Sequence, residues 1–90
     1  MPLFAVICRD NADSVQLRLD TRETHLAYLA DTGVVQFAGP LIKDGQPAGS
    51  LLVIEAESLQ AARDWAAGDP YAKAGLFEAA TVTEWRKVIG

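Results

Sequence analysis

Two short segments of this chain, Leu3–Cys8 and Leu51–Ile54, are apolar at consecutive positions. A β-strand points successive side chains to opposite faces, so an unbroken apolar run indicates a strand that is buried on both faces. The longer run has six residues, too few for a membrane-spanning helix or the core of a signal peptide. Whatever sheet contains these strands must therefore be covered on both sides.

Residues Val15–Asp31 are predicted to form a helix. Asp13 is expected to cap it, with Gln16 completing a capping box, and Gly33 is expected to end it. His25 is expected to border the core-facing stripe of this helix without lying at its centre. The residues assigned to that stripe are Val15, Leu19, Leu26, Leu29 and Ala30.

A hairpin is predicted in the middle of the chain. Val34–Ala38 forms its first strand and ends at Gly39–Pro40, with Leu41–Ile42 as an alternative extension. Asp44–Gly45 provides the turn, because both residues tolerate positive φ. The chain then returns as a strand over Gly49–Ala56.

A second helix is predicted over Leu59–Ala67, capped by Ser58 and ended by Gly68 and Pro70. The proline favours an extended backbone at Asp69. After a short turn, the last strand covers Leu76–Glu84. The residues of this helix expected to face the core are Leu59, Ala62, Trp65 and Ala66.

The order β-α-β-β-α-β predicts one α+β domain over residues 1–90, with a ferredoxin-like four-stranded antiparallel sheet and both helices on one face. The helices leave the other face of the sheet open, although its strands are apolar on both sides. A second copy of the chain is the simplest cover. We therefore expect a homodimer that associates through the open sheet face, with Phe4, Val6 or their strand neighbours at the contact.

Composition excludes several function classes. The formal net charge is −4 and basic residues are scattered, which disfavours nucleic acid as a partner. One cysteine and one histidine cannot build a metal or iron–sulfur site, so no metal and no cofactor are expected. The sequence contains neither a targeting signal nor a membrane-spanning segment, which makes the cytoplasm the expected location. A small anion held by arginines remains open.

The chemistry of the chain is concentrated in its first helix. His25 is the only histidine, and helical spacing places it on the same side as Arg18 and Arg22. Imidazole is the side chain best suited to proton transfer near neutral pH. A lone helical histidine is nevertheless more often a packed or solvent-facing residue, and spacing alone does not decide between the two.

The chain resembles the YCII-related (YciI-like) family of the dimeric α/β-barrel superfamily. The resemblance begins with the opening apolar strand and covers nearly the whole sequence. The other matching motifs are, in order, Asp13–Ser14, Arg22-x-x-His25–Leu26, Gly39–Pro40, Gly49–Ser50, Glu57–Ser58–Leu59, Ala66-x-x-Asp69–Pro70–Tyr71, Ala74–Gly75 and Trp85–Arg86–Lys87.

The resemblance implies a His–Asp pair made by His25 and Asp69, and acid/base chemistry of the lyase or isomerase type on a small cyclic or keto-acid-like substrate. Arg22, Tyr71 and Ser50 are the expected substrate-binding residues. Each has a structural alternative: Asp69 as a turn residue, Arg22 in an ion pair, Tyr71 in the core, Ser50 in a local hydrogen bond. The competing function is a non-catalytic dimeric module that binds a small metabolite or assists a partner enzyme.

Overall fold

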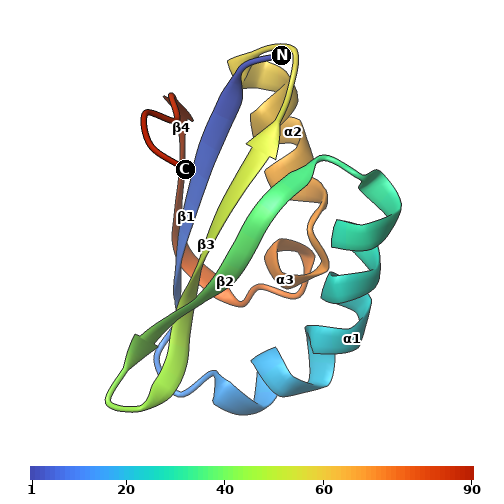
Figure 1. The fold of residues 1–90 in the computed structure, drawn as a ribbon. Helices are drawn as coiled ribbons and strands as arrows, with labels where there is room; N and C mark the ends of the chain where they lie inside the picture. The colour runs from blue at the N-terminus through green and yellow to red at the C-terminus, as the bar shows by residue number, and fades with distance from the viewer.

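The computed structural model describes residues 1–90 (Figure 1). Its elements are β1 (Leu3–Asp10), α1 (Val15–Thr32), β2 (Val35–Lys43), β3 (Gln46–Glu55), α2 (Leu59–Gly68), α3 (Pro70–Lys73) and β4 (Phe77–Trp85). The predicted order of strands and helices is confirmed. The single turn of helix α3, which the sequence suggested only as a turn, follows α2 directly.

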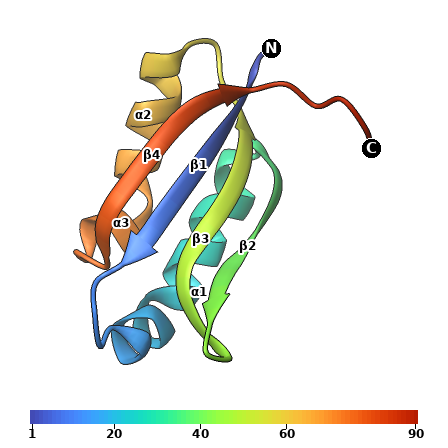
Figure 2. The ribbon, with the colours of Figure 1, turned by 90° about the vertical axis from the view of Figure 1, so that its left-hand side faces the viewer.

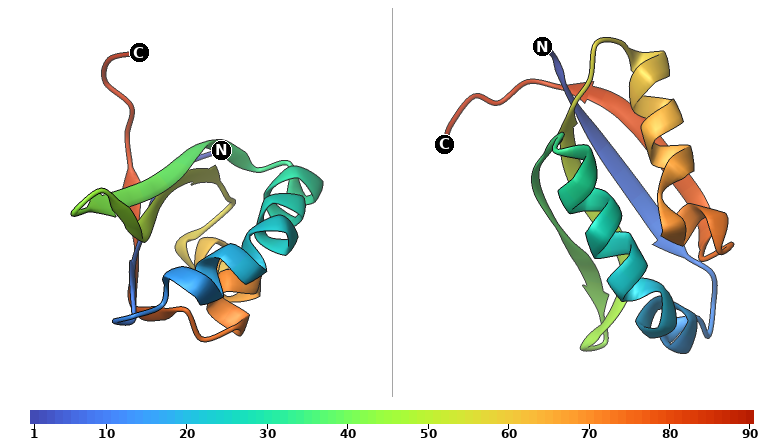
Figure 3. Two further views of the ribbon diagram at one scale, coloured as in Figure 1. Left: turned by 90° about the horizontal axis from the view of Figure 1, so that it is seen from below. Right: turned by 90° about the vertical axis from the view of Figure 1, so that its right-hand side faces the viewer.

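The strands form one antiparallel sheet in the order β2-β3-β1-β4, and the helices lie together on one of its faces (Figure 3). This is the α+β ferredoxin-like arrangement that the sequence predicted. Helix α1 packs over β2 and β3, whereas α2 packs over β1 and β4. No helix is long and apolar enough to cross a membrane.

The predicted hairpin is present, with positive φ at Asp44 (53°) and Gly45 (77°). β2 runs through Gly39 and Pro40 to Lys43, and Pro40 pairs with Ser50. The predicted end of the strand at Gly39–Pro40 is therefore wrong, and the alternative extension over Leu41–Ile42 is confirmed. β2 lies at the edge of the sheet. A proline fits there because its missing N–H interrupts no hydrogen bond to a further strand.

The two faces of the sheet divide the apolar residues between them. Phe4 and Val6 lie in the core beneath the helices, together with Cys8, Leu52 and Ile54. Of the two alternatives expected at the open face, Phe4 and Val6 are therefore wrong, and strand alternation places their strand neighbours there. The residues that the register places on the open face include Leu3, Ala5, Ile7, Leu51 and Val53.

Figure 2 turns the open face of the sheet toward the viewer. The register places two aromatic rings from the outer strands on this face. Phe37 of β2 and Trp85 of β4 meet edge to face with centroids 6.0 Å apart. Val53 lies between their strands and is buried, while both rings remain exposed. This chain alone thus covers only part of the open face, as the strand pattern predicted.

Helix α1 differs most from its prediction. Its buried residues are Arg18 and His25, whereas Leu19 and Leu26 of the predicted stripe are 56% and 42% exposed. Periodicity counts only apolar side chains, and here the helix turns a polar edge inward. His25 is therefore part of the buried edge and does not merely border it.

The predicted capping box at the start of α1 is also wrong. Ser14 occupies the N-cap position, and its hydroxyl donates to the carbonyl of Ala12. Asp13 has a left-handed backbone, with φ of 57°, one residue before the cap. Gln16 donates to Asp20 within the helix. At the other end Gly33 adopts the predicted left-handed conformation, with φ of 68°.

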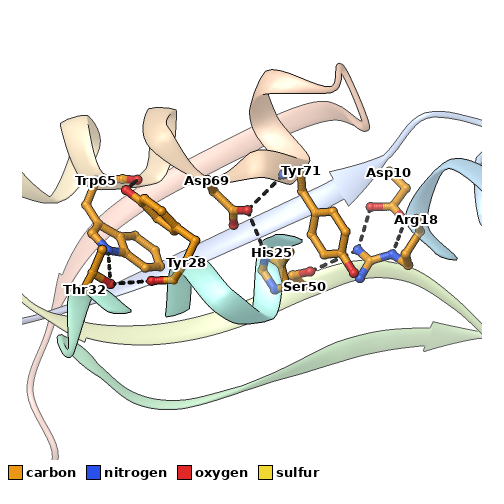
Figure 4. A network of polar contacts seen from close by, with 9 residues as sticks. All are labelled: Asp10, Arg18, His25, Tyr28, Thr32, Ser50, Trp65, Asp69 and Tyr71. Carbon is orange, nitrogen blue, oxygen red and sulfur yellow. Dashed lines mark hydrogen bonds and ion pairs between the residues drawn. The ribbon is translucent and has the colours of Figure 1, made fainter. Parts of the chain in front are cut away.

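Helix α2 follows its prediction more closely. Ser58 accepts a hydrogen bond from the N–H of Ala61, and Ala62 is fully buried. Leu59, which was expected to face inward, is exposed. The hydroxyl of Tyr28 on α1 donates to the carbonyl of Trp65, so a polar contact joins the two helices near the C-terminal end of α1 (Figure 4).

Candidate active site

His25 of α1 meets Asp69 at the junction of α2 and α3. Asp69 lies between α2 and α3, with the extended backbone (φ −61°, ψ 129°) that the following Pro70 favours. Its Oδ1 accepts a hydrogen bond from the N–H of Tyr71 at 2.9 Å and lies 2.7 Å from Nδ1 of His25 (Figure 4). Because a carboxylate only accepts, Nδ1 carries the hydrogen of the second bond.

The imidazole is held on two sides and open at one atom. His25 is 6% exposed, and its ring stacks on Tyr71 with centroids 3.9 Å apart and planes 15° apart. Every fully buried side-chain nitrogen or oxygen in the protein has a hydrogen-bond partner, whereas Nε2 of His25 has none. Nε2 therefore reaches solvent. A ring fixed by Asp69 at one nitrogen and free at the other has the orientation that proton transfer requires.

A second buried ion pair lies on the same edge of α1. Arg18 donates to both carboxylate oxygens of Asp10, at 2.8 and 2.9 Å, and to the hydroxyl of Ser50 at 3.0 Å. Its guanidinium lies over the ring of Tyr71, 4.7 Å from the centroid. Burial lowers the pKa of Arg18, but the hydrogen bond and charge of Asp10 outweigh burial and raise it overall. Arg18 thus remains charged inside the protein.

Tyr71 occupies the space between His25 and Arg18 (Figure 4). Burial raises the pKa of its hydroxyl, although the neighbouring Arg18 and Arg22 act in the opposite direction. The phenol is therefore protonated at neutral pH and available as a hydrogen-bond donor. One tyrosine ring connects the His–Asp pair to the Arg–Asp pair.

A cavity of about 260 Å³ opens beside Tyr71, between α1 and strand β2. Arg18 and Arg22 line its α1 side with three leucines, and Ala38, Gly39 and Pro40 line its β2 side. Arg22 is exposed and forms no ion pair within the chain. A guanidinium in this position is available to an anionic ligand. The two exposed leucines of α1, Leu19 and Leu26, also line this cavity.

The structure brings most of the predicted site residues together. His25, Asp69 and Tyr71 are in mutual contact, Ser50 binds Arg18, and Arg22 lies at the cavity wall. Among their structural alternatives, burial of Tyr71 and a turn hydrogen bond of Asp69 are both observed. The local hydrogen bond considered for Ser50 is not, because its partner Arg18 lies 32 positions away in the chain. The ion pair considered for Arg22 is not observed either. The roles of these residues in binding or catalysis stay predictions.

Asp10 was missed as a member of the site, and Arg18, although expected on the same side of the helix as His25, was not among the predicted site residues. Arg18 lies two helical turns before His25 on the same side of α1, which the sequence does show, but a buried arginine needs a partner that helix spacing cannot reveal. That partner comes from the end of β1. Cys8 lies nearby in the core; burial, with the charges of Asp69 and Asp10, raises the pKa of its thiol to about 12. A nucleophilic role for Cys8 has no support.

Solved structures share this fold. The chain superposes with a TM-score of 0.84 and 36% identity on 5-chloro-2-hydroxyhydroquinone dehydrochlorinase (TftG) from Burkholderia phenoliruptrix AC1100, a structure in complex with 2,5-dihydroxybenzoquinone; the match covers 93% of each chain. A NIPSNAP family protein from Agrobacterium tumefaciens matches with a TM-score of 0.59 over 96% of this chain and 91% of its own. At 17% identity, that second likeness concerns the fold alone.

Sequence comparison gives the family. Protein YciI from Escherichia coli O6:H1 is 38% identical over 96% of this chain and 98% of that protein. The model of the YCII-related domain matches residues 2–86, almost the whole chain. The resemblance inferred from the ordered motifs is thereby confirmed. The chain belongs to the YCII-related family.

Proposed function

We propose that this protein is a lyase-type enzyme that moves a proton with His25, assisted by Asp69, on a small cyclic or keto-acid-like substrate. The observation that carries the proposal is the buried contact of 2.7 Å between Nδ1 of His25 and Oδ1 of Asp69, with Nε2 left open. Asp69 fixes the tautomer in which Nε2 is the basic nitrogen and stabilises the imidazolium that forms when Nε2 takes a proton.

Elimination and isomerisation both fit such a site. In an elimination, Nε2 takes a proton from the substrate, the released electron pair forms a new π bond, and the leaving group departs with its own bonding pair. In an isomerisation, the imidazolium returns the proton to a different atom of the substrate. Neither reaction changes the oxidation state of the protein. General acid–base catalysis of this kind contributes roughly a hundredfold to ten-thousandfold in rate.

The polar groups beside the imidazole suit a developing oxyanion. The protonated hydroxyl of Tyr71 can donate a hydrogen bond, and Arg22 at the cavity wall provides an unpaired positive charge. Ser50 is buried and accepts from Arg18, which lines the cavity, so it would act on a ligand by positioning that guanidinium. The cavity of about 260 Å³ has room for a single ring or a short keto acid. Tyr71, Arg22 and Ser50 are therefore the proposed substrate-binding residues.

The named reaction of one relative gives the proposal a first substrate to test. TftG is a dehydrochlorinase, an enzyme that removes hydrogen chloride, and its substrate is a hydroxylated ring. The loss of a proton and a chloride is an elimination in the sense above. At 36% identity over nearly the full chain, a related reaction on a related ring is a reasonable starting point.

The proposal includes a homodimer formed through the open sheet face. Leu51, Ile7, Phe37 and Trp85 are apolar and exposed on that face. Exposed apolar clusters of this kind mark protein contacts. We expect sedimentation at micromolar concentration to give a dimer and Leu51→Lys to give a monomer. A wild-type monomer at that concentration would contradict the dimer.

The test of the reaction is chloride release from 5-chloro-2-hydroxyhydroquinone, followed by a panel of small keto acids. We expect His25→Gln to lower kcat by about a hundredfold to ten-thousandfold. Glu23→Gln, an exposed change on the same helix, is the matched control and should stay within twofold of wild type. Asp69→Asn should also lower kcat, because the neutral amide no longer provides the negative charge that stabilises the imidazolium formed during proton transfer.

The same measurements separate the enzyme from the non-catalytic module. Both functions predict that a ligand binds beside Tyr71, but only the enzyme predicts that His25→Gln removes turnover while calorimetry still detects binding. Equal turnover in His25→Gln and wild type would contradict the catalytic role of His25. Binding without turnover of any compound in the panel would favour the module.

A further inference from the structure

A second cavity, of about 570 Å³, lies on the other side of the His–Asp pair, between α2, α3 and strand β4. Its walls are mostly apolar and include Val6, Cys8, Phe77 and Ala80. The cavity beside Tyr71 and this one share no lining residue. Asp69 lines only the second, whereas Tyr71 lines only the first.

One oxygen of Asp69 is without a partner and faces this space. Asp69 is 2% exposed, and both of its hydrogen bonds, from His25 and from the N–H of Tyr71, are accepted by Oδ1 (Figure 4). No group of the chain donates to Oδ2. Because every fully buried side-chain oxygen has a partner, Oδ2 is not fully buried. Asp69 lines this cavity, so we infer that Oδ2 is the atom that reaches it. Cys8 in the same wall has a pKa raised by burial and then by Asp69, which agrees with a carboxylate close to this cavity.

We propose that this cavity is a binding site for a small neutral ring that carries a hydroxyl group, and that the hydroxyl donates a hydrogen bond to Oδ2 of Asp69. The apolar wall favours an apolar body. The carboxylate accepts but cannot donate, so it selects a donor and repels an anion. Arg63 lines the exposed side of the cavity, and its positive charge disfavours a cation. A neutral phenol or alcohol satisfies all three conditions.

A ligand in the second cavity would affect His25 through Asp69, without touching the imidazole. A hydrogen bond donated to Oδ2 withdraws charge from the carboxylate whose Oδ1 holds Nδ1 of His25. The occupant of the second cavity therefore adjusts how strongly Asp69 stabilises the imidazolium. This site depends on the geometry alone and stands whether or not the proposed reaction is correct.

The chain offers a matched pair of variants. Ala80 on β4 pairs with Cys8, and Ala38 on β2 pairs with Leu52, so both alanines point to the helix-covered side of opposite edge strands. Both are exposed, and each lines one of the two cavities. Ala80→Leu fills the second cavity and leaves the first intact, whereas Ala38→Leu does the reverse. Ala72→Leu, from α3, fills the second cavity from its other side.

The experiment titrates phenol into ¹⁵N-labelled protein and follows backbone amides and the His25 ring by NMR. We expect phenol to shift the amides of Ala72 and Ala80 and the ring signals of His25. Anisole, which has the same shape without the donor, should bind about tenfold more weakly, because a hydrogen bond to a charged group is lost. Benzoate and benzylammonium should also bind more weakly than phenol.

The variants decide where phenol binds. Ala80→Leu and Ala72→Leu should abolish these shifts, while Ala38→Leu, with an unchanged melting temperature, should keep them. Shifts confined to the amides of Ala38 and Tyr71, or unchanged binding to Ala80→Leu, would overturn the proposal. Equal affinity for phenol and anisole would overturn the role of Oδ2. Absence of binding up to the solubility of phenol would overturn the site itself. None of these results depends on turnover.

Discussion

Helices α1 and α2 cover the same face of one sheet but bury opposite kinds of residue. Helix α2 turns Ala62 into the core and keeps Arg63 and Asp64 in solvent. Helix α1 buries Arg18 and His25 and leaves Leu19 and Leu26 exposed. The difference shows where the chain gives up apolar packing: each buried polar group of α1 has an acidic partner from another element, Asp10 or Asp69. Helix α1, which buries polar side chains, is also the helix that carries His25 and Arg22 of the candidate site.

The largest effect expected from this comparison is that of Arg18→Met. The variant leaves the carboxylate of Asp10, 5% exposed, without its cation, and we expect the free energy of unfolding to fall by about 3–5 kcal/mol. Arg63→Met on α2 is the matched control; it changes an exposed arginine and should stay within about 0.5 kcal/mol of wild type. Urea unfolding measures both. Equal stability of the two variants would remove the contrast between the helices.

The reactivity of the Cys8 thiol provides a chemical test of the core beneath the two helices. Its pKa of about 12, against 9.0 for a free thiol, predicts roughly a thousandfold less thiolate at pH 8 than an exposed cysteine has. Iodoacetamide should therefore modify the native protein very slowly, with a rate that still rises between pH 8 and 10. Protein unfolded in urea is the control, and its rate should level off roughly one pH unit above the free-thiol pKa of 9.0. Fast modification of native Cys8 at pH 8 would contradict the burial.

The raised pKa of Cys8 also predicts how the free energy of unfolding changes with pH. The unfolded chain releases the proton of Cys8 near pH 9 while the folded chain retains it, so the contribution of this thiol to stability is complete below pH 9 and declines above it. Replacement by a residue that does not titrate, Cys8→Ala, should flatten this part of the stability curve.

A smaller effect is expected at the two helix caps. Asp69 caps α3 through the N–H of Tyr71 and also holds His25, whereas Ser58 caps α2 through the N–H of Ala61 and does nothing more. We expect Asp69→Ala to cost about 2 kcal/mol and Ser58→Ala about 1 kcal/mol of unfolding free energy. Asp69→Asn keeps an acceptor for Tyr71 and should cost less than Asp69→Ala. A larger loss for Ser58→Ala than for Asp69→Ala would contradict the second role of Asp69.

The sequence predicted those features that depend on local conformation. Asp44–Gly45 fixes the hairpin, Gly33 ends α1, and Pro70 sets the backbone of Asp69, each by a rule that needs only adjacent residues. The order of strands and helices follows from such signals, and the order in turn predicts the sheet. Pairing His25 with Asp69 needed the family resemblance, since the two residues are 44 positions apart.

The errors have a common cause in tertiary contact. The inward face of α1 is decided by Asp10 and Asp69, which lie outside the helix, and no count of leucines within the helix can include them. Similarly, Pro40 is tolerated inside β2 only because that strand lies at the sheet edge. The choice between Phe4 and Val6 or their strand neighbours for the open face stayed undecided because an apolar run does not reveal which of its two faces meets the helices.

The smallest effect in the comparison is expected for Leu19→Gln. Leu19 is 56% exposed, so the loss of its apolar side chain should change the free energy of unfolding by less than about 0.5 kcal/mol. Leu29→Gln on the same helix is the matched control: Leu29 packs against the core, and its replacement should cost about 2 kcal/mol or more. Urea unfolding at two protein concentrations measures both. A loss for Leu19→Gln as large as that for Leu29→Gln would mean that the leucine edge of α1 is covered in solution, and α1 would then bury both of its edges.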